Sequence, residues 1–128
     1  VYKGMRLEQA QSSFVSPGLT RNVAAVTGAC MAVAREKIEK QGGFDESFII
    51  CGSDVELCLR LHQGGLCNVY IPQVRLIHHE SKSRGSRIPA NDFTRSKEAY
   101  GQYLRQGDPY YNRNLSLEDT QGGFKRPS

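Results

Sequence analysis

The chain has 128 residues, of which 38% are hydrophobic, so it is long enough for one compact domain and too short for two. The formal net charge of +4 comes from 17 basic residues that are spread along the chain, so the charge balance is compatible with a phosphorylated ligand but names no partner. No apolar run approaches the roughly 20 residues of a membrane span, so we do not expect this chain to cross a bilayer itself.

Cysteine usage favours a reducing compartment. The four cysteines show no C-x-x-C spacing, and no apolar signal segment precedes them; they are Cys30, Cys51, Cys58 and Cys67. Reduced thiols in a cytosolic setting are therefore expected rather than a disulfide framework. The sequence begins without an initiator methionine, which is consistent with a piece of a longer protein.

The first half of the chain predicts a lead-in loop, a strand and a helix. Residues 1–20 are polar and contain Pro17 and Gly18, which is typical of a loop. The small apolar run NVAAVTGACMAVAR, residues 22–35, predicts a buried strand interrupted at Gly28. AREKIEKQGG, residues 34–43, then predicts a short helix that its final glycine pair ends with a left-handed cap.

A second helix is predicted over DVELCLRLHQ, residues 54–63. Ser53 and Glu56 form the pattern S-x-x-E, which is typical of a capping box. A helix from this point places four side chains on one face, namely Val55, Cys58, Leu59 and His62. The pair Gly64 and Gly65 would end it.

The remainder predicts extended chain, a loop, a third helix and a tail. LCNVYIP and VRLIHH read as two extended pieces around Pro72. After the polar loop 81–90, Asn91 or Asp92 can cap a helix that has Phe93, Tyr100, Tyr103 and Leu104 on one side and ends at Gly107 and Pro109. We therefore divide the chain into a lead-in loop 1–20, a sheet and helix core 21–80, a flexible loop 81–90, and a helix with tail 91–128.

Asp54 is the first candidate for chemistry. It falls in the first turn of the second helix, where free N–H groups and the helix dipole favour a carboxylate. Its role there can be purely electrostatic. Alternatively, a carboxylate fixed at the rim of a pocket can accept a proton from an attacking hydroxyl. In that alternative Glu56 serves the cap and Asp54 serves the chemistry.

Two further patterns are weaker. His78 and His79 follow extended chain, where ligand sites lie in many α/β sheets, but such a histidine can equally be structural. The segment Lys82, Ser83 and Arg84 offers donors for phosphate oxygens beside a glycine, and a solvated loop is its simpler interpretation.

Four ordered blocks resemble a known family. They are TGACMAVAREKIEKQGGFDESF, GSDVELCLRLHQGG, VYIPQVRLIHHESKSRG and DPYYNRNLSL, and they cover residues 27–117. They look like the C-terminal half of family 2 glycosyltransferases, which have the Rossmann-like GT-A fold. The resemblance implies an α/β partial GT-A domain with a mixed sheet and flanking helices.

The resemblance also implies an activity. Such enzymes invert the anomeric carbon while moving a sugar from a nucleotide diphosphate donor to an acceptor hydroxyl, and a divalent cation, Mg²⁺ or Mn²⁺, holds the diphosphate. Polysaccharide or cell-surface glycan synthesis in the cytoplasm or at the inner face of the membrane, with a glycan or lipid-linked acceptor, is the implied setting. The family usually reads Glu-Asp where this chain has Ser53 and Asp54, and the aspartate is the general base.

Further site residues follow from the resemblance. Asp54 matches the catalytic base. Of the pair His78 and His79, His78 matches the metal-site histidine. The residues that match the substrate-binding positions are Gly28, Ala29, Gly43, Phe44, Asp45, Lys82, Ser83 and Arg84. Asp45 and Glu46 would shape the edge of the pocket.

The family's N-terminal nucleotide-binding half, with its D-x-D metal motif, would precede residue 1, and no D-x-D occurs in this chain. We therefore expect the chain alone to be inactive, and an exposed sheet edge to favour self-association. An inactive, glycosyltransferase-like scaffold is the alternative function. A nucleic-acid binder using SKSRGSR is a third, which the ordinary tyrosine and phenylalanine content does not favour.

Overall fold

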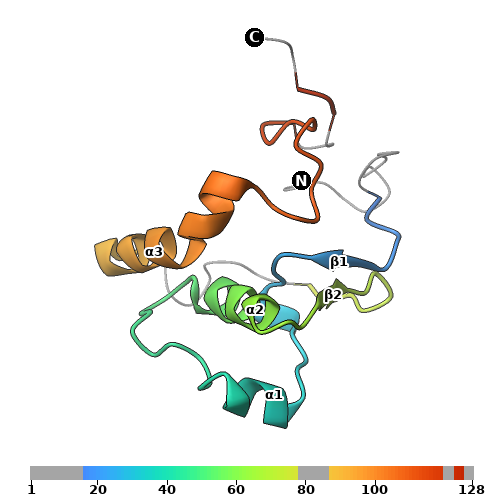
Figure 1. Ribbon diagram of the computed structural model, residues 1–128. Helices are drawn as coiled ribbons and strands as arrows, with labels where there is room; N and C mark the ends of the chain where they lie inside the picture. Colours follow the sequence, from blue (N-terminus) through green and yellow to red (C-terminus); the bar gives the residue numbers. More distant parts are fainter. Residues whose placement is uncertain (1–15, 78–86, 120–122, 126–128) are drawn as a thin grey trace.

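A computed structural model describes residues 16–77, 87–119 and 123–125 of the chain. These residues form a small α/β arrangement of two short strands, one short 3-10 helix and three α-helices (Figure 1). In chain order the elements are β1 (Arg21–Val23), η2 (Gly28–Cys30), α1 (Arg35–Lys40), α2 (Ser53–Gln63), β2 (Asn68–Tyr70) and α3 (Ala90–Gln106).

The two strands pair antiparallel. Arg21 lies opposite Tyr70 and Val23 opposite Asn68. The predicted mixed sheet is therefore not found in the described part of the chain, and the predicted strand over residues 22–35 is wrong beyond Val23. The run that follows Val23 leaves the sheet because its backbone turns toward α2, where the Val26 N–H lies 3.5 Å from the Cys58 sulfur. Of the two extended pieces, the first contains β2, and the described residues of the second, 74–77, form no strand.

The core is built around α2, which lies between β2 and α3 (Figure 1). Its buried residues are Leu57, Cys58, Leu59 and Leu61, and Leu115 from the tail is buried as well. The predicted apolar face was partly wrong, since Val55 and His62 are only half-buried. Because α2 has neighbours on two sides, its buried stripe is wider than one helical face and includes Leu57 and Leu61.

Asn68 joins the sheet to this core. It is 8% exposed, and its side-chain amide donates to the carbonyl of Ala24 at 2.9 Å and to that of Cys58 at 2.8 Å. A buried amide is tolerated where its donors are satisfied, as they are here. Asn68 therefore fixes the position of β2 relative to α2.

The first predicted helix stop is confirmed. Gly42 and Gly43 both have left-handed backbones, with φ of 82° and 77°. The Gly43 N–H donates to the carbonyl of Ile38 at 2.9 Å, and the Gln41 N–H donates to the same carbonyl at 3.2 Å, so the last turn of α1 is closed by both bonds. The chain thereby turns out of α1 into the loop that leads to α2.

The third helix forms, but the predicted capping of its start by Asn91 or Asp92 is wrong. α3 begins at Ala90 with Pro89 as its N-cap residue, and no side chain caps it. Asn91 and Asp92 instead lie in the first turn and bond to the loop before α2. Gly107, with φ of 86°, ends α3 as predicted. On the predicted apolar face, Tyr100 and Tyr103 are half-buried, whereas Phe93 and Leu104 are exposed.

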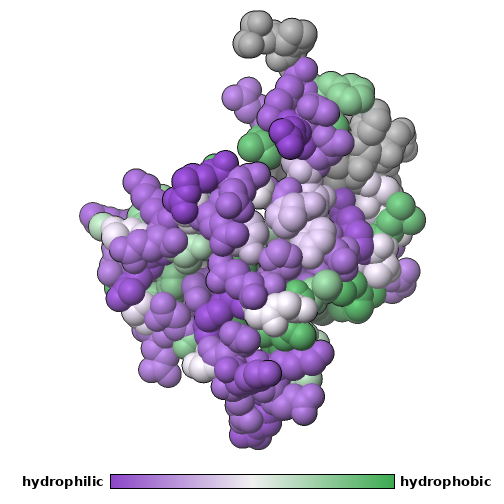
Figure 2. All heavy atoms as spheres, viewed as in Figure 1, coloured by the Kyte–Doolittle hydropathy of each residue, from purple (hydrophilic) through white to green (hydrophobic). Residues whose placement is uncertain are grey.

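The surface is mostly hydrophilic in the view of Figure 2, with hydrophobic residues gathered on the side of the sheet. The exposed large apolar residues in and after β2 are Val69, Ile71, Val74, Leu76 and Ile77. Surfaces of this kind are commonly covered by another segment or another chain, so self-association stays a prediction. Among the described residues, no helix combines the length and apolar character needed to span a bilayer.

Candidate functional site

Asp54 lies in the first turn of α2 with both carboxylate oxygens bonded to the backbone. The Gly28 N–H donates to Oδ2 at 2.8 Å, and the Val55 N–H donates to Oδ1 at 2.9 Å. Asp54 is half-buried, and each oxygen of a carboxylate has two lone pairs, so each retains one acceptor position. The side chain is thus held in one direction and can still accept a proton.

Gly28 approaches Asp54 closely although 26 residues separate them in the sequence. A Cβ atom at position 28 would lie 3.1 Å from the Asp54 Cβ and 3.4 Å from Oδ2. The preceding Thr27 accepts from the Ala29 N–H through its hydroxyl at 3.3 Å, which orients the turn. Gly28 is therefore required as a small residue at the point where this turn meets α2.

The predicted capping box is wrong. The N-cap residue is Gly52, with φ of 106° and no side-chain cap, and Ser53 is the first residue of the helix. The Glu56 backbone N–H donates to the carbonyl of Gly52 at 2.9 Å. A Cβ at position 52 would lie 2.8 Å from a ring carbon of Phe48 and 2.9 Å from the Ser96 hydroxyl. Only glycine fits this backbone and this space, which overrides the local S-x-x-E signal.

Glu56 bonds to Arg60 and not to a helix cap. Its two carboxylate oxygens accept from Arg60 Nε at 2.8 Å and Nη2 at 2.7 Å. This bidentate bond raises the pKa of the Arg60 guanidinium. Arg60 in turn donates to the carbonyl of Gly43 at 2.8 Å and to that of Gln41. The guanidinium therefore fastens the turn after α1 onto α2.

The loop between this turn and α2 contains the remaining described candidates. Phe44 is 47% exposed. Asp45 accepts from the Ser47 N–H at 2.9 Å, and the hydrogen bonds from Ser47 lower the pKa of the Asp45 carboxyl. Gly43 is held by Arg60. Of the predicted residues, Gly28 contacts Asp54 directly, whereas Phe44 and Asp45 belong to this adjacent loop.

Sequence reasoning missed a buried carboxylate, that of Asp92. It is fully buried, and it accepts three backbone N–H groups from residues 49–51 at 2.8 to 3.0 Å. These bonds lower the pKa of the Asp92 carboxyl, and the bond from the Ile49 N–H contributes most. Tyr100, from the same helix, donates to the Gly52 carbonyl at 3.4 Å, and burial raises its pKa, with the charge of Asp54 contributing. α3 thus packs on the chain that leads into Asp54.

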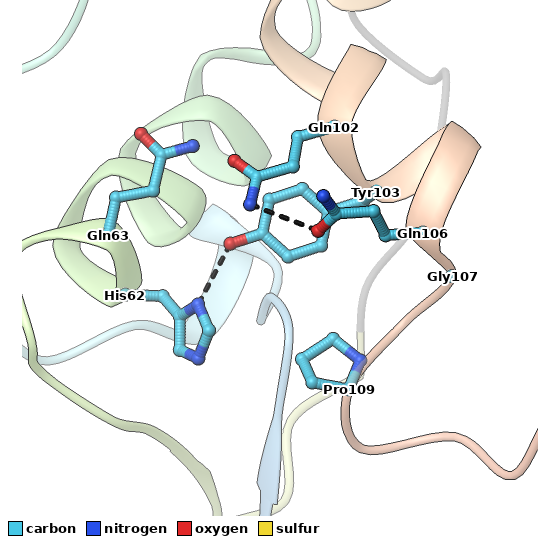
Figure 3. A pocket seen from close by; sticks show the side chains of 7 residues that line it. All are labelled: His62, Gln63, Gln102, Tyr103, Gln106, Gly107 and Pro109. Carbon is cyan, nitrogen blue, oxygen red and sulfur yellow. Dashed lines mark hydrogen bonds between the residues drawn. The ribbon is translucent and has the colours of Figure 1, made fainter.

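An open groove lies at the opposite end of α2 (Figure 3). It has a volume of about 430 Å³ and is lined by His62, Gln63, Gln102, Tyr103, Gln106, Gly107 and Pro109. His62 Nδ1 and the Tyr103 hydroxyl share a hydrogen bond of 2.8 Å, and Gln102 donates to Gln106 at 3.2 Å. Asp54 is not among the residues that line this groove.

The predicted metal and phosphate residues, His78, Lys82, Ser83 and Arg84, lie outside the described residues. Within residues 16–77, 87–119 and 123–125, no three His, Cys, Asp or Glu side chains gather in a group that could hold a metal ion. The described residues therefore do not supply a set of ligands for the implied cation.

Comparison with known proteins finds relatives in bacteria. The chain is 52% identical over 109 residues to the O-antigen biosynthesis protein RfbC of Myxococcus xanthus, across 84% of this chain and 8% of that protein. It is 34% identical over 90 residues to the N-acetylglucosaminyl-diphospho-decaprenol L-rhamnosyltransferase of Mycobacterium tuberculosis, across 70% of this chain and 26% of that protein.

A third relative is the uncharacterized protein y4gI of Sinorhizobium fredii. The two sequences are 37% identical over 107 residues, across 78% of this chain and 12% of that protein. The chain thus spans 8% to 26% of the length of these curated relatives. No family model matches the chain. No solved structure matches it either.

Proposed function

We propose that this chain is the acceptor-side part of an inverting, family 2-like glycosyltransferase with a GT-A fold. It would act in polysaccharide or cell-surface glycan synthesis. The observation that carries the proposal is the Asp54 carboxylate, which the Gly28 and Val55 N–H groups hold at the start of α2. The names of two relatives, an O-antigen biosynthesis protein and a rhamnosyltransferase, support it.

In the proposed reaction Asp54 acts as general base. The acceptor hydroxyl oxygen forms a bond to the anomeric carbon of the donor sugar while the bond from that carbon to the nucleoside diphosphate breaks. The hydroxyl proton passes to the free acceptor position of the Asp54 carboxylate, and the diphosphate leaves with the bonding electrons. A single displacement of this kind inverts the anomeric configuration.

The surroundings of Asp54 suit this role. A base must be held at a fixed distance from the proton it removes, and its N–H bonds keep the carboxylate from rotating. Gly28 bonds to Asp54 and Ala29 follows it, and we propose that the sugar ring would lie against these two small residues. Gly43, Phe44 and Asp45 would border the same space from the loop fastened by Arg60.

The remaining parts of the proposal come from the resemblance. They are a nucleotide-sugar donor, a glycan or lipid-linked acceptor, Mg²⁺ or Mn²⁺, and a location in the cytoplasm or at the inner face of the membrane. His78 and the segment Lys82 to Arg84 are its proposed metal and diphosphate contacts. No step of the reaction is assigned to the cation, because the described residues offer it no set of ligands.

The proposal is tested by sugar transfer in the full-length protein. A panel of nucleotide-diphosphate sugars that includes a rhamnose donor would be supplied with lipid-linked acceptors, and the glycan product and released nucleoside diphosphate measured. Asp54→Asn keeps the size of the side chain and removes its basicity, so we expect kcat to fall by about 10² to 10⁴.

Glu36→Gln is the matched control, because Glu36 is also a first-turn carboxylate but lies exposed on α1. It should leave turnover unchanged. Transfer by Asp54→Asn at the wild-type rate would refute the assignment of the base. Failure of the wild-type protein to transfer any sugar of the panel would favour the scaffold function instead.

A further inference from the structure

The burial of Asp92 needs an explanation, because a carboxylate loses much hydration free energy when it leaves water. Asp92 lies in the first turn of α3, and its side chain is fully buried. The hydrogen bonds that compensate for this loss come from the backbone N–H groups of one short stretch of chain. The Ile49 N–H donates to Oδ1 at 2.8 Å, and the Ile50 and Cys51 N–H groups donate to Oδ2 at 2.8 Å and 3.0 Å.

Three successive N–H groups that converge on one anion fix the backbone that carries them. Residues 49–51 are therefore held as a unit against the start of α3. A neutral asparagine could not replace this arrangement, since it has one acceptor oxygen and its NH₂ group would face a donor. The negative charge and both oxygens of Asp92 are used.

The held segment leads directly into Asp54. Gly52 follows Cys51 with φ of 106°, enclosed between Phe48 and Ser96 of α3, and the Tyr100 hydroxyl bonds to its carbonyl at 3.4 Å. Ser53 and Asp54 are the next residues and begin α2. Only the enclosed Gly52 and Ser53, the first residue of α2, separate the anchored backbone from Asp54.

We propose that Asp92 is a positioning residue for Asp54. It holds the backbone of residues 49–51 so that the first turn of α2 presents the Asp54 carboxylate to the acceptor hydroxyl. This inference rests on the proposed function, in which Asp54 is the base. A displacement of about 1 Å at a reacting group can cost about 100-fold in rate, so a loosened segment reduces turnover more than substrate binding.

The test compares Asp92→Asn with Asn91→Ala in the full-length protein. Asn91 also ties α3 to this loop, through a 2.8 Å bond to the Ser47 carbonyl, but at a point farther from Asp54 in the chain. Both variants remove a bond between α3 and the loop, and only one loosens the segment next to the base. Steady-state sugar transfer gives kcat and KM for each, alongside Asp54→Asn.

We expect Asp92→Asn to lower kcat by about 10-fold to 100-fold with little change in KM, and Asn91→Ala to leave both near wild type. Amide hydrogen exchange at residues 49–54 should accelerate in Asp92→Asn. Equal kcat in the Asp92 and Asn91 variants, or a loss confined to KM, would overturn the positioning role while leaving Asp54 as base. Wild-type turnover in Asp54→Asn would overturn the proposed function, and this inference with it.

If Asp92→Asn does not fold, Asp92→Glu takes its place. Glutamate keeps the charge and both oxygens but displaces them by one methylene group. A folded Glu variant with reduced kcat and unchanged KM supports the positioning role, and one with wild-type kcat overturns it.

Discussion

The two ends of helix α2 differ in how their side chains are held. At the N-terminal end, Asp54 is bonded to the backbone of a distant turn, and the chain before it is anchored to α3 by Asp92. At the C-terminal end, His62 and Tyr103 share a hydrogen bond and line an open groove together with glutamine side chains (Figure 3). The groove of Figure 3 therefore lies at the end of α2 opposite the carboxylate that two backbone N–H groups hold.

Under the proposed function, the proton is transferred at the N-terminal end of α2 and the groove of Figure 3 takes no part in the reaction. Catalysis by a general base depends on a fixed carboxylate within reach of its substrate. The N-terminal end of α2 provides the fixed carboxylate, whereas the C-terminal end provides an open polar surface. Four substitutions test whether the two ends differ in stability and function as the structure indicates.

Gly52→Ala should have the largest effect on stability. An alanine there adopts a backbone that favours glycine and places its Cβ 2.8 Å from Phe48 and 2.9 Å from Ser96. Strain and overpacking together should lower the free energy of unfolding by about 3 kcal/mol. Urea unfolding of the purified protein measures this.

The control is Gly65→Ala, at a residue with φ of 82° and no atom within 4 Å of the added Cβ. This substitution should lower the free energy of unfolding by only about 1 kcal/mol, because only the left-handed backbone conformation disfavours alanine there. Equal losses at the two positions would show that the enclosure of Gly52 contributes nothing.

Arg60→Met should have the next largest effect. The substitution removes a bidentate ion pair with Glu56 and the bonds to two carbonyls of the turn after α1, with both charged side chains largely buried. We expect a loss of about 2 kcal/mol. Arg35→Met is the matched control, since Arg35 and Glu39 have the same spacing but are 88% and 60% exposed.

The control variant should change stability by less than about 0.5 kcal/mol. Thermal unfolding followed by circular dichroism resolves the two values. A loss at Arg35 as large as that at Arg60 would mean that the carbonyl contacts of Arg60 do not hold the turn.

Asp92→Asn should also change how stability depends on pH. The pKa of Asp92 is lowered in the folded protein, so its stabilising effect is present above the unfolded value of about 3.9 and is lost as pH falls through the folded value. The difference in unfolding free energy between wild type and variant should therefore shrink in acid. A difference that stays constant from neutral pH to about pH 3 would contradict the ionised state of Asp92.

Tyr103→Phe should have the smallest effect. It removes one hydrogen bond to His62, at the end of α2 away from Asp54. We expect a loss of about 1 kcal/mol in stability and no change in the rate of sugar transfer. A fall in turnover without a change in stability would place the groove of Figure 3 in the reaction.

Local signals in the sequence were sufficient where the structure depends on neighbouring residues. The glycine pairs after α1 and α2 mark the ends of both helices as predicted, because a left-handed residue is needed there. Asp54 was also correctly placed in the first turn of α2. The helix start itself was misjudged by one residue, since packing against Phe48 and Ser96 selects Gly52 as the N-cap residue.

The long-range contacts could not be predicted from the sequence. Asp92 is 41 to 43 residues away from the N–H groups that donate to it. An aspartate in the first turn of a helix gives the same local sequence pattern whether it caps its own helix or bonds to a distant loop. The Glu56 and Arg60 pair has the i, i+4 spacing of a helical ion pair, a signal that competed with the capping box. The strand prediction over residues 22–35 fails beyond Val23 because the backbone there turns toward α2, where the Val26 N–H lies 3.5 Å from the Cys58 sulfur.

The most direct measurement is the rate of sugar transfer after one substitution at each end of α2. Asp54→Asn removes the proposed base, and His62→Gln replaces a groove residue with a side chain that can still bond to Tyr103. We predict that Asp54→Asn loses nearly all turnover while His62→Gln retains it. Retained turnover in Asp54→Asn, with loss in His62→Gln, would contradict the assignment of the N-terminal end of α2 as the catalytic end.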